Sequence, residues 1–378
     1  MSFLKLGLSK ELANQVSKQN YKKPTPVQNE AIPNILLGID LLAVAKTGSG
    51  KTAAFVLPLL QLLEKPKKKK TRFIRSLILS PTRELAEQLK GVIEQFTDNL
   101  AYKINTMAVY GGVSINPQMQ KLSNVDILVA TPGRLLDLLE QNAVHLSETE
   151  VLILDEADKM LNKAFEEEMG KILSFLPKKR QNLLFSATFS EKIEKISSTI
   201  LSKPTVVRIK EEENNIDLIT QKAYLVKAEN KGPFLRKLIN ENDFKQILIF
   251  VSSTRTADNL VQKLNKNGIS SHAIHSKKSQ AARTEALRRF KQGNINVLVA
   301  TDLLARGIDI DFLPCVINYE LPRSPKDYVH RIGRTGRAEN AGKAISLITK
   351  DDAHHFKIIQ KKMKKQVETV KVEQKPKQ

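Results

Sequence analysis

Short runs of consecutive apolar residues recur along this chain, and most of them end in a turn of small or polar residues that leads into a segment with helical periodicity. Apolar runs without alternation are typical of strands that are buried on both faces of a parallel sheet. In the first half, such runs predict strands at 41–45, 76–80, 126–130, 151–154 and 182–185. The alternation of strands and helices predicts an α/β fold, in which helices flank a mostly parallel sheet.

A second series of buried strands begins near residue 246, and its strand ends resemble those of the first half. The segment 252–255 resembles 80–83, and the strand at 297–301 resembles the strand at 126–130. This repetition predicts two tandem copies of one fold. Between the copies the pattern loosens, so we expect a linker there. The expected parts are a first domain at 1–207, a linker at 208–218, a second domain at 219–362 and a basic tail at 363–378.

Two helices are expected before the first strand. The first covers 8–20, with Ser9 as its N-cap. Gln28 is expected to open the second, which runs to about Leu37. A glutamine in a first helical turn is commonly just solvated, but its amide can also pair with N6 and N7 of adenine. Both interpretations remain open for Gln28.

The charge of the chain points to a polyanionic partner. Its 378 residues carry a formal net charge of +21, which favours nucleic acid over a membrane surface. Aromatic residues make up 5% of the chain and tryptophan is absent, so contacts to the nucleic-acid backbone are favoured over base stacking. The single Cys315 excludes an intramolecular disulfide framework and fits a reducing cytoplasm. We see neither a signal peptide nor an apolar run of 18 residues.

A glycine-rich loop lies between the strand at 41–45 and an apolar helix expected at 53–63. This order of strand, loop and helix is that of a phosphate-binding loop. Gly48 and Gly50 let backbone N–H groups turn toward an anion, Lys51 can reach the β and γ phosphates, and the Thr52 hydroxyl can bind Mg²⁺. Ala45 occupies the first position, where the pattern has glycine. The loop residues are Ala45, Lys46, Thr47, Gly48, Ser49, Gly50, Lys51 and Thr52.

Two carboxylates follow the buried strand at 151–154. Open α/β sheets bind their ligands at the carboxyl ends of the strands, where Asp155 and Glu156 stand. Alone, they could form only a solvated acidic turn. Combined with the phosphate loop, they predict a nucleoside triphosphatase, in which Asp155 holds Mg²⁺ and Glu156 orients and deprotonates the attacking water.

Hydroxyl, glycine and arginine residues recur where other strands meet helices. Such groups at helix N-termini can bind phosphates of a nucleic-acid backbone, although each could be an ordinary N-cap or a helix-surface arginine. Ser186 and Thr188, at the end of the strand at 182–185, could relay changes from the acidic site or could also be N-caps. The candidates for backbone contact are Pro81, Thr82, Arg83, Thr131, Pro132, Gly133 and Arg134.

The second half has neither a Gly-Lys-Thr loop nor an Asp-Glu strand end, so it cannot hydrolyse a nucleotide by itself. It has Arg334 and Arg337, which are flanked by glycines that permit close approach. Arginines supplied from across an interface accelerate phosphoryl transfer by roughly 10³ to 10⁵. A basic surface helix without a ligand is the alternative. Residues 357–378 could likewise be solvated and disordered or make salt-sensitive RNA contacts.

In these motifs and in their order, the sequence resembles the DEAD-box RNA helicase family from Phe3 to about Ile359, with Asp155-Glu156-Ala157-Asp158 as the motif that names it. The segment 113–119 resembles the RhlE-like bacterial group. The resemblance implies two RecA-like domains, adenine recognition by Tyr21 and Gln28, RNA-backbone contacts by Gly111 and Gly112, and coupling of hydrolysis to unwinding by Ser186 and Thr188. In the second domain it implies nucleotide-sugar contacts by Gly307 and Asp309, an arginine-finger motif from His330 to Arg337, and RNA or interface contacts by Gln280, Arg283, Thr301 and Asp302.

The resemblance therefore implies an ATP-dependent RNA helicase that uses ATP and Mg²⁺. ATP and RNA would close its two domains, and closure would melt short RNA duplexes or remodel RNA–protein complexes. We expect a cytoplasmic monomer that contacts RNA backbones, with ribosomal precursors or the RNA-decay machinery as possible partners. One alternative is an ATP-gated RNA clamp with little turnover, and a second is a DNA translocase.

Overall fold

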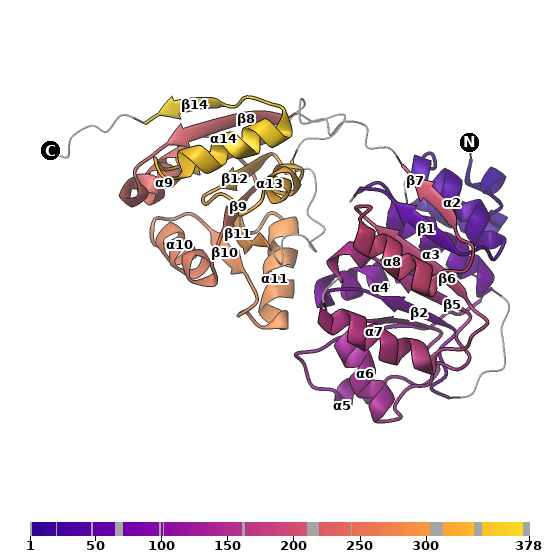
Figure 1. Ribbon diagram of the computed structural model, residues 1–378. Coiled ribbons are helices and arrows are strands. Elements are labelled where there is room, and N and C mark those ends of the chain that lie inside the picture. The colour runs from indigo at the N-terminus through magenta and orange to yellow at the C-terminus, as the bar shows by residue number, and fades with distance from the viewer. Residues whose placement is uncertain are drawn as a thin grey trace. The chain divides into compact units, whose positions relative to one another are not determined.

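The computed structural model divides the chain into two compact parts, which we call unit 1 (Met1–Glu211) and unit 2 (Glu212–Gln378) (Figure 1). The structure describes residues 2–19, 21–46, 48–64, 71–97, 100, 102–160, 163–209, 219–242, 244–302, 313–335 and 342–372.

Unit 1 is built on a seven-stranded sheet in the order β3-β4-β2-β5-β6-β1-β7, in which every pairing is parallel. All five apolar runs of the first half form strands, as predicted, and each lies between two neighbouring strands. The strands are β1 (Leu41–Val44), β2 (Ser76–Leu79), β3 (Thr106–Val109), β4 (Ile127–Ala130), β5 (Val151–Leu154), β6 (Gln181–Ser186) and β7 (Thr205–Arg208).

Helices cover both faces of this sheet. The first four pack on one face and bury side chains such as Leu12, Ile32 and Phe55. The last three pack on the other face, with Leu135, Ile172 and Ile193 in that core. The helices are α1 (Lys10–Lys18), α2 (Pro26–Leu36), α3 (Lys51–Leu62), α4 (Arg83–Thr97), α5 (Asn116–Gln120), α6 (Pro132–Glu140), α7 (Lys163–Phe175) and α8 (Glu191–Ile200), with the 3₁₀ turns η1 (Phe3–Leu6) and η2 (Ala157–Lys159).

Unit 2 repeats this architecture. Its seven parallel strands run in the order β10-β11-β9-β12-β13-β8-β14, so each position of the first sheet has a counterpart, and the predicted duplication is confirmed. Helices α9 and α10 pack on one face, and α11, α13 and α14 pack on the other. The strands are β8 (Ile219–Leu225), β9 (Ile247–Val251), β10 (Ser271–Ile274), β11 (Val297–Thr301), β12 (Cys315–Asn318), β13 (Gly342–Ile348) and β14 (Glu368–Lys371). The helices are α9 (Lys231–Glu241), α10 (Thr254–Lys266), α11 (Gln280–Lys291), α13 (Pro325–Ile332) and α14 (Asp352–Met363), with the 3₁₀ turn η4 (Ala228–Asn230).

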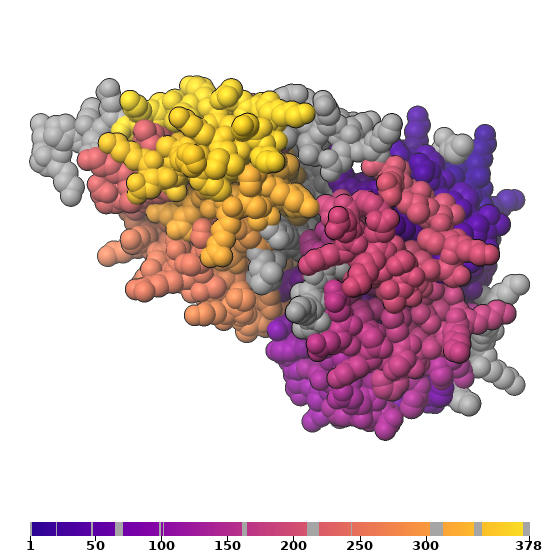
Figure 2. All heavy atoms as spheres, in the orientation of Figure 1, coloured from indigo at the N-terminus to yellow at the C-terminus, as the bar shows by residue number. Residues whose placement is uncertain are grey.

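The expectation of a basic tail from residue 363 is wrong for the part that the structure describes. Strand β14 pairs with β8 and completes the second sheet, as β7 completes the first. The sequence gives little sign of it, because Glu368 and Thr369 are exposed and no apolar run forms. Residues 368–371 form a strand because their backbone hydrogen-bonds to β8, and not because their side chains are buried. In the space-filling view, α14 and β14 form much of the visible surface of unit 2 (Figure 2).

Several smaller expectations have been tested by the structure. Ser9 is the N-cap of α1, as predicted, because its hydroxyl accepts from Leu12 N at 3.3 Å. Arg208 belongs to β7, so this residue lies in the first sheet and not in a linker. Residues 210–218 of the expected linker and residues 373–378 lie outside the described residues, and the domain boundaries stay predictions. Within the part of the chain that the structure describes, no helix is long and apolar enough to cross a membrane.

Candidate active site

The carboxyl edge of the sheet in unit 1 divides into two halves. Strands β5, β6 and β1 are neighbours, and they carry the acidic pair, the Ser186 to Thr188 segment and the phosphate loop. Strands β3, β4 and β2 are also neighbours, and they carry the glycine and arginine candidates for RNA contact. The predicted chemical and RNA-binding residues therefore lie along one edge, grouped by role.

The phosphate loop has the backbone that its glycines predict. Gly48 and Gly50 both have left-handed φ angles, of 77° and 92°. A Cβ atom at Gly50 would lie 2.6 Å from Gln28 Nε2, so this position also requires glycine for space. Lys51 begins α3, two residues earlier than expected, and is 7% exposed. Its amine donates to Ala45 O.

The electrostatics of this loop suit an anion. Burial lowers the pKa of the Lys51 amine below its usual value of 10.5, while the charges of Asp155 and Glu156 act to raise it. A phosphate would restore a counter-charge to this lysine at a helix N-terminus. Among the described residues, Ser49 Oγ is buried without a hydrogen-bond partner, as expected of a group that a ligand would satisfy. Thr52 is half-buried in the first turn of α3, and Thr47 lies outside the described residues.

Gln28 is fully buried, so its interpretation as a solvated glutamine is wrong. Helix α2 begins at Pro26, and the Gln28 side chain reaches back to accept from Thr25 N at 2.9 Å. Its Nε2 donates to Gly50 O at 3.1 Å, which ties this helix to the phosphate loop. An amide has a further lone pair and a further N–H, so these bonds leave capacity for another partner. Tyr21 is half-buried and packs on Phe96, with ring centroids 5.7 Å apart.

The acidic pair is buried, which excludes a solvated acidic turn. Asp155 and Glu156 are each 5% exposed. Burial, and next the charge of Glu156, raise the pKa of Asp155 from 3.8 to about 7. The raised pKa means that the charged form of Asp155 is unfavourable in this buried place, and a bound divalent cation would stabilise that form. Among the described residues, no group of three or more His, Cys, Asp and Glu side chains is placed to hold a metal ion.

Ser186 and Thr188 are bonded to the acidic loop through Asp158. Asp158 Oδ1 lies 3.0 Å from Ser186 Oγ and accepts from Ala187 N at 3.0 Å. Thr188 N donates to Ser186 Oγ at 3.2 Å. Helix α8 is capped by Ser190, so the interpretation of Ser186 and Thr188 as N-caps is wrong. Asp158 was not among the candidate site residues, although it belongs to the same acidic run.

Arg83 and the two glycines after β3 meet in the RNA half of the edge. Gly112 has a φ of 74°, and a Cβ atom there would lie 2.0 Å from Arg83 Nη2, so the guanidinium lies directly over this glycine. Gly111 N donates to Thr131 Oγ1 at 3.4 Å, which links the ends of β3 and β4. Thr82 is an ordinary N-cap, because its Oγ1 accepts from Leu85 N at 3.3 Å. Pro81 precedes this cap and is half-buried.

Arg134 is not a helix-surface arginine, because it is 7% exposed. Its Nη2 donates to Val113 O at 2.8 Å, and its Nε lies 3.3 Å from Asp137 Oδ2. The side chain therefore fixes the loop after β3 to helix α6, which begins at Pro132 with Gly133 in its first turn. These two bonds hold the Arg134 side chain in place, and they occupy its Nε and Nη2 donors.

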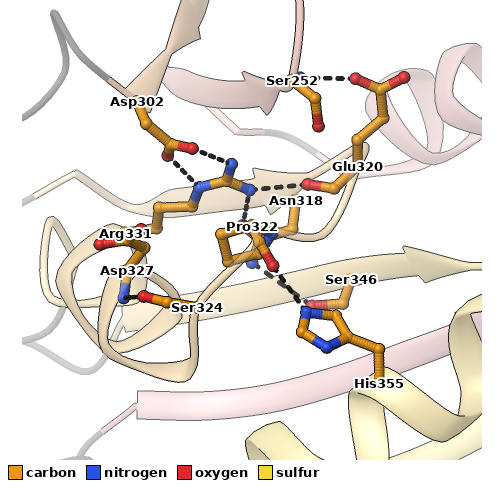
Figure 3. Close-up of polar contacts among 10 residues, drawn as sticks. All are labelled: Ser252, Asp302, Asn318, Glu320, Pro322, Ser324, Asp327, Arg331, Ser346 and His355. Atoms are coloured by element: carbon orange, nitrogen blue, oxygen red, sulfur yellow. Dashed lines mark hydrogen bonds and ion pairs between the residues drawn. The ribbon is translucent and has the colours of Figure 1, made fainter.

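In unit 2, Asp302 is bonded internally to Arg331 (Figure 3). Both carboxylate oxygens of Asp302 accept from Arg331, at 2.5 and 2.8 Å. The guanidinium also donates to Asn318 Oδ1 at 3.0 Å and Glu320 O at 2.6 Å, and its carbon lies 4.9 Å from the Phe250 ring centre. The geometry gives Asp302 a structural partner, and its contact with RNA stays a prediction. Arg331 was not among the candidate site residues, although it stands beside His330.

The other candidates of unit 2 lie on several of its elements. Gln280 begins α11, and its Oε1 accepts from Arg283 Nη2 at 2.6 Å. Thr301 ends β11. His330 is half-buried in α13, and Arg334 is 9% exposed, with its carbonyl bonded to Leu313 N at 3.1 Å. Gly307, Asp309 and Arg337 lie outside the described residues.

Comparisons with known proteins agree with this arrangement. Residues 25–196 match the family model of DEAD/DEAH box helicases, and residues 230–339 match the helicase conserved C-terminal domain. The ATP-dependent RNA helicase CshA of Listeria monocytogenes is 38% identical over 369 residues, which cover 97% of this chain and 69% of the relative. The DEAD-box ATP-dependent RNA helicase 24 of Arabidopsis thaliana is 40% identical over 357 residues, covering 93% of this chain and 47% of the relative.

Solved structures show the same fold. Dbp5 of S. cerevisiae bound to RNA and ADP BeF3 superposes with a TM-score of 0.83 at 32% identity, covering 98% of this chain and 95% of that one. A DEAD box protein from Methanococcus jannaschii matches with a TM-score of 0.55 at 37% identity, covering 99% of both chains.

Proposed function

This chain belongs to the DEAD/DEAH box helicase family and is a DEAD-box ATP-dependent RNA helicase with two RecA-like domains, and from that premise we propose which of its residues bind and hydrolyse ATP and which contact RNA. The proposal rests chiefly on one observation. Lys51, Asp155 and Ser186 follow or end three neighbouring strands, and the charges of Asp155 and Glu156 act on the Lys51 amine.

In this proposal, unit 1 holds ATP. The N–H groups of residues 46–52 and the Lys51 amine bind the phosphates, and Gln28 and Tyr21 contact the adenine. Asp155 and Thr52 would hold Mg²⁺, which neutralises phosphate charge when bound. Glu156 accepts a proton from water as the water oxygen attacks the γ-phosphorus and the bond to the β,γ-bridging oxygen breaks. The acidic loop is bonded to Ser186 through Asp158, and we propose that this bond links hydrolysis to RNA release.

Unit 2 supplies what unit 1 lacks. We propose that Arg334 and Arg337 stabilise the charge that develops on the transferred phosphoryl group, with His330 as their neighbour in the motif. Gly307 and Asp309 would contact the nucleotide sugar. Hydrolysis would then need both units, and binding of ATP and RNA together would bring their residues into one reaction.

RNA is proposed to bind along the other half of each carboxyl edge. In unit 1, Arg83 and Arg134 contact phosphates, and the glycines let the backbone approach closely. In unit 2, Gln280, Arg283 and Thr301 do the same. Dbp5 was solved with RNA bound, which supports an RNA site on this fold. Contacts of this kind read little sequence, so we propose broad RNA specificity.

The assignment to a subgroup is also a proposal. The RhlE-like interpretation rests on 113–119, whereas the bacterial relatives found in the comparison are CshA helicases. A cytoplasmic location and a monomeric state remain proposals as well. Ribosomal precursors and the RNA-decay machinery, named above as partners, also remain proposals.

Glu156→Gln tests the proposal most simply. This variant should bind ATP like the wild type but lose multiple-turnover, RNA-stimulated hydrolysis by roughly 10² to 10⁴, because it removes a positioned base. Normal turnover would remove Glu156 from this role.

A wild-type protein that hydrolysed one ATP and then stayed on RNA would instead be a clamp. Equal stimulation by matched single-stranded DNA would contradict RNA selectivity, which we expect to depend on 2′-hydroxyl contacts.

A further inference from the structure

The carboxylate of Glu156 has a positively charged partner that the reaction described above does not use. Lys159 Nζ contacts Glu156 Oε2. The two side chains are 20% and 7% exposed, so the ion pair is largely shielded from water. Because shielding strengthens an ion pair and bonding fixes its geometry, this contact restrains Glu156 far more than a surface pair would.

The local fold produces this contact. Glu156 has a left-handed φ of 53° and caps the 3₁₀ turn η2, whose last residue is Lys159. Lys159 N donates to Glu156 O at 2.9 Å, which closes the turn and brings the lysine side chain back over the glutamate. A residue three positions after the glutamate is thereby placed beside it without help from a distant element.

The three carboxylates of the acidic loop have different partners. Asp155 Oδ1 accepts from Glu156 N at 3.0 Å. Asp158 is bonded to Ser186 and Ala187. Glu156 is the carboxylate that pairs with Lys159, through one of its two oxygens. The oxygen of Glu156 that contacts Lys159 is Oε2.

We propose that Lys159 is a positioning residue for ATP hydrolysis, which holds the Glu156 carboxylate by Oε2 so that Oε1 can take the proton of the attacking water. The proposal rests on the role proposed above for Glu156. A glutamate has several rotatable bonds, and a small misplacement of a reacting group is costly in rate. Lys159 therefore affects the chemical step and leaves ATP binding to the phosphate loop.

The test compares Lys159→Met, which removes the charge at similar length, with Lys159→Arg, which keeps it. Lys192→Met, at an exposed position of α8, is the matched control. Steady-state RNA-stimulated hydrolysis gives kcat and KM for ATP, and titration with a fluorescent non-hydrolysable ATP analogue gives Kd. We expect Lys159→Met to lower kcat by roughly 10-fold or more, with KM and Kd within about threefold of the wild type. Lys159→Arg should restore most of kcat, and Lys192→Met should match the wild type.

Several results would overturn the proposal. They are an unchanged or raised kcat in Lys159→Met, a Kd weakened as much as kcat is lowered, or an equal loss in Lys159→Met and Lys159→Arg. Thermal melting is measured for each variant, and a loss of activity that follows the folded fraction alone would also count against it. Glu156→Gln, assayed in parallel, separates the two claims. If it keeps turnover, the role of Glu156 fails, whereas if it loses turnover and Lys159→Met does not, the positioning role alone fails.

Discussion

The two units place a buried lysine at the same position of the same fold, and they use it differently. Lys51 begins the helix that follows β1, and Lys231 begins the helix that follows β8. These strands are counterparts, each second from an edge of its sheet. Both lysines are 7% exposed. The fold alone therefore does not decide which of them serves a nucleotide.

The surroundings of the two lysines decide it. The Lys231 amine donates to Tyr319 O at 3.1 Å and pairs with Asp352 Oδ2 at 3.4 Å. Burial acts to raise the pKa of Asp352, but hydrogen bonds from Thr349 and the charge of Lys231 hold this pKa below its usual value. Lys51 instead donates to a backbone carbonyl, and a glycine-rich loop precedes it where unit 2 has the turn η4. Unit 2 thus provides an ion-pair partner for its lysine, whereas for unit 1 we propose that a phosphate takes that place.

The largest effect should come from the arginine that unit 2 contributes. Arg334→Ala should lower RNA-stimulated kcat for ATP by about 10³, because an arginine that stabilises the transferring phosphoryl group contributes this much or more. ATP binding to unit 1 should change little. Stopped-flow or steady-state phosphate release measures the rate. A loss below about threefold would remove Arg334 from this role.

Removing the two lysines in turn tests the comparison itself. Lys51→Ala should lower ATP turnover by roughly 10² to 10³, because a cation that stabilises developing phosphate charge is lost. Lys231→Ala should leave kcat within about twofold, but it should lower stability by roughly 1–2 kcal/mol because Asp352 loses a buried partner. Phosphate release and thermal unfolding of both variants give the answer. Equal kinetic losses would contradict the different roles of the two lysines.

The pH dependence of stability reports on Asp155. Its pKa of about 7 lies above the ordinary value of 3.8, so the folded state holds the proton more tightly than the unfolded state does. The preference of the folded state for protonated Asp155 therefore contributes fully to stability below pH 4, and this contribution is lost as the pH rises toward and through 7. Without Mg²⁺ or nucleotide, the melting temperature of the wild type should fall between pH 5 and 8 relative to Asp155→Asn. Parallel curves for the two proteins would contradict the raised pKa.

The smallest expected effect concerns the RNA half of unit 1. Gly112→Ala should weaken binding of single-stranded RNA several-fold, because the methyl group would displace the Arg83 guanidinium and the φ of 74° disfavours alanine. Fluorescence anisotropy with a labelled RNA measures the change. ATP affinity should be unchanged, since this glycine lies away from the phosphate loop along the edge. Gly91→Ala, in α4 with open space around it, is the control.

Much of this fold could be predicted from the sequence, because buried strands leave an apolar run that is visible along the chain. Strands β1, β4 and β5 are such runs, and the resemblance of the ends of β9 and β11 to those of β2 and β4 also predicted the second copy. Strand β14 was missed because its side chains are mostly exposed, and its partner β8 lies about 145 residues earlier. The internal repeat is the signal that indicates this strand, since β7 occupies the same edge position in the first sheet.

The site could be predicted less completely, because sequence gives the residue types but not their partners. The glycines of the phosphate loop and the acidic pair stand at strand ends, as predicted. The bonds of Asp158 to Ser186, and of Arg331 to Asp302, depend on which strands are neighbours. The same holds for Gln28, whose interpretation changed because its side chain reaches Gly50, 22 residues later in the chain.

The stoichiometry of ATP binding tests the comparison of the two units most directly. Calorimetric titration of the full chain with a non-hydrolysable ATP analogue should give one site per chain. This site should be lost or strongly weakened in Lys51→Ala and kept in Lys231→Ala. Two sites in the wild type, or a site that survives in Lys51→Ala and disappears in Lys231→Ala, would contradict the conclusion that unit 1 alone leaves its lysine to a nucleotide.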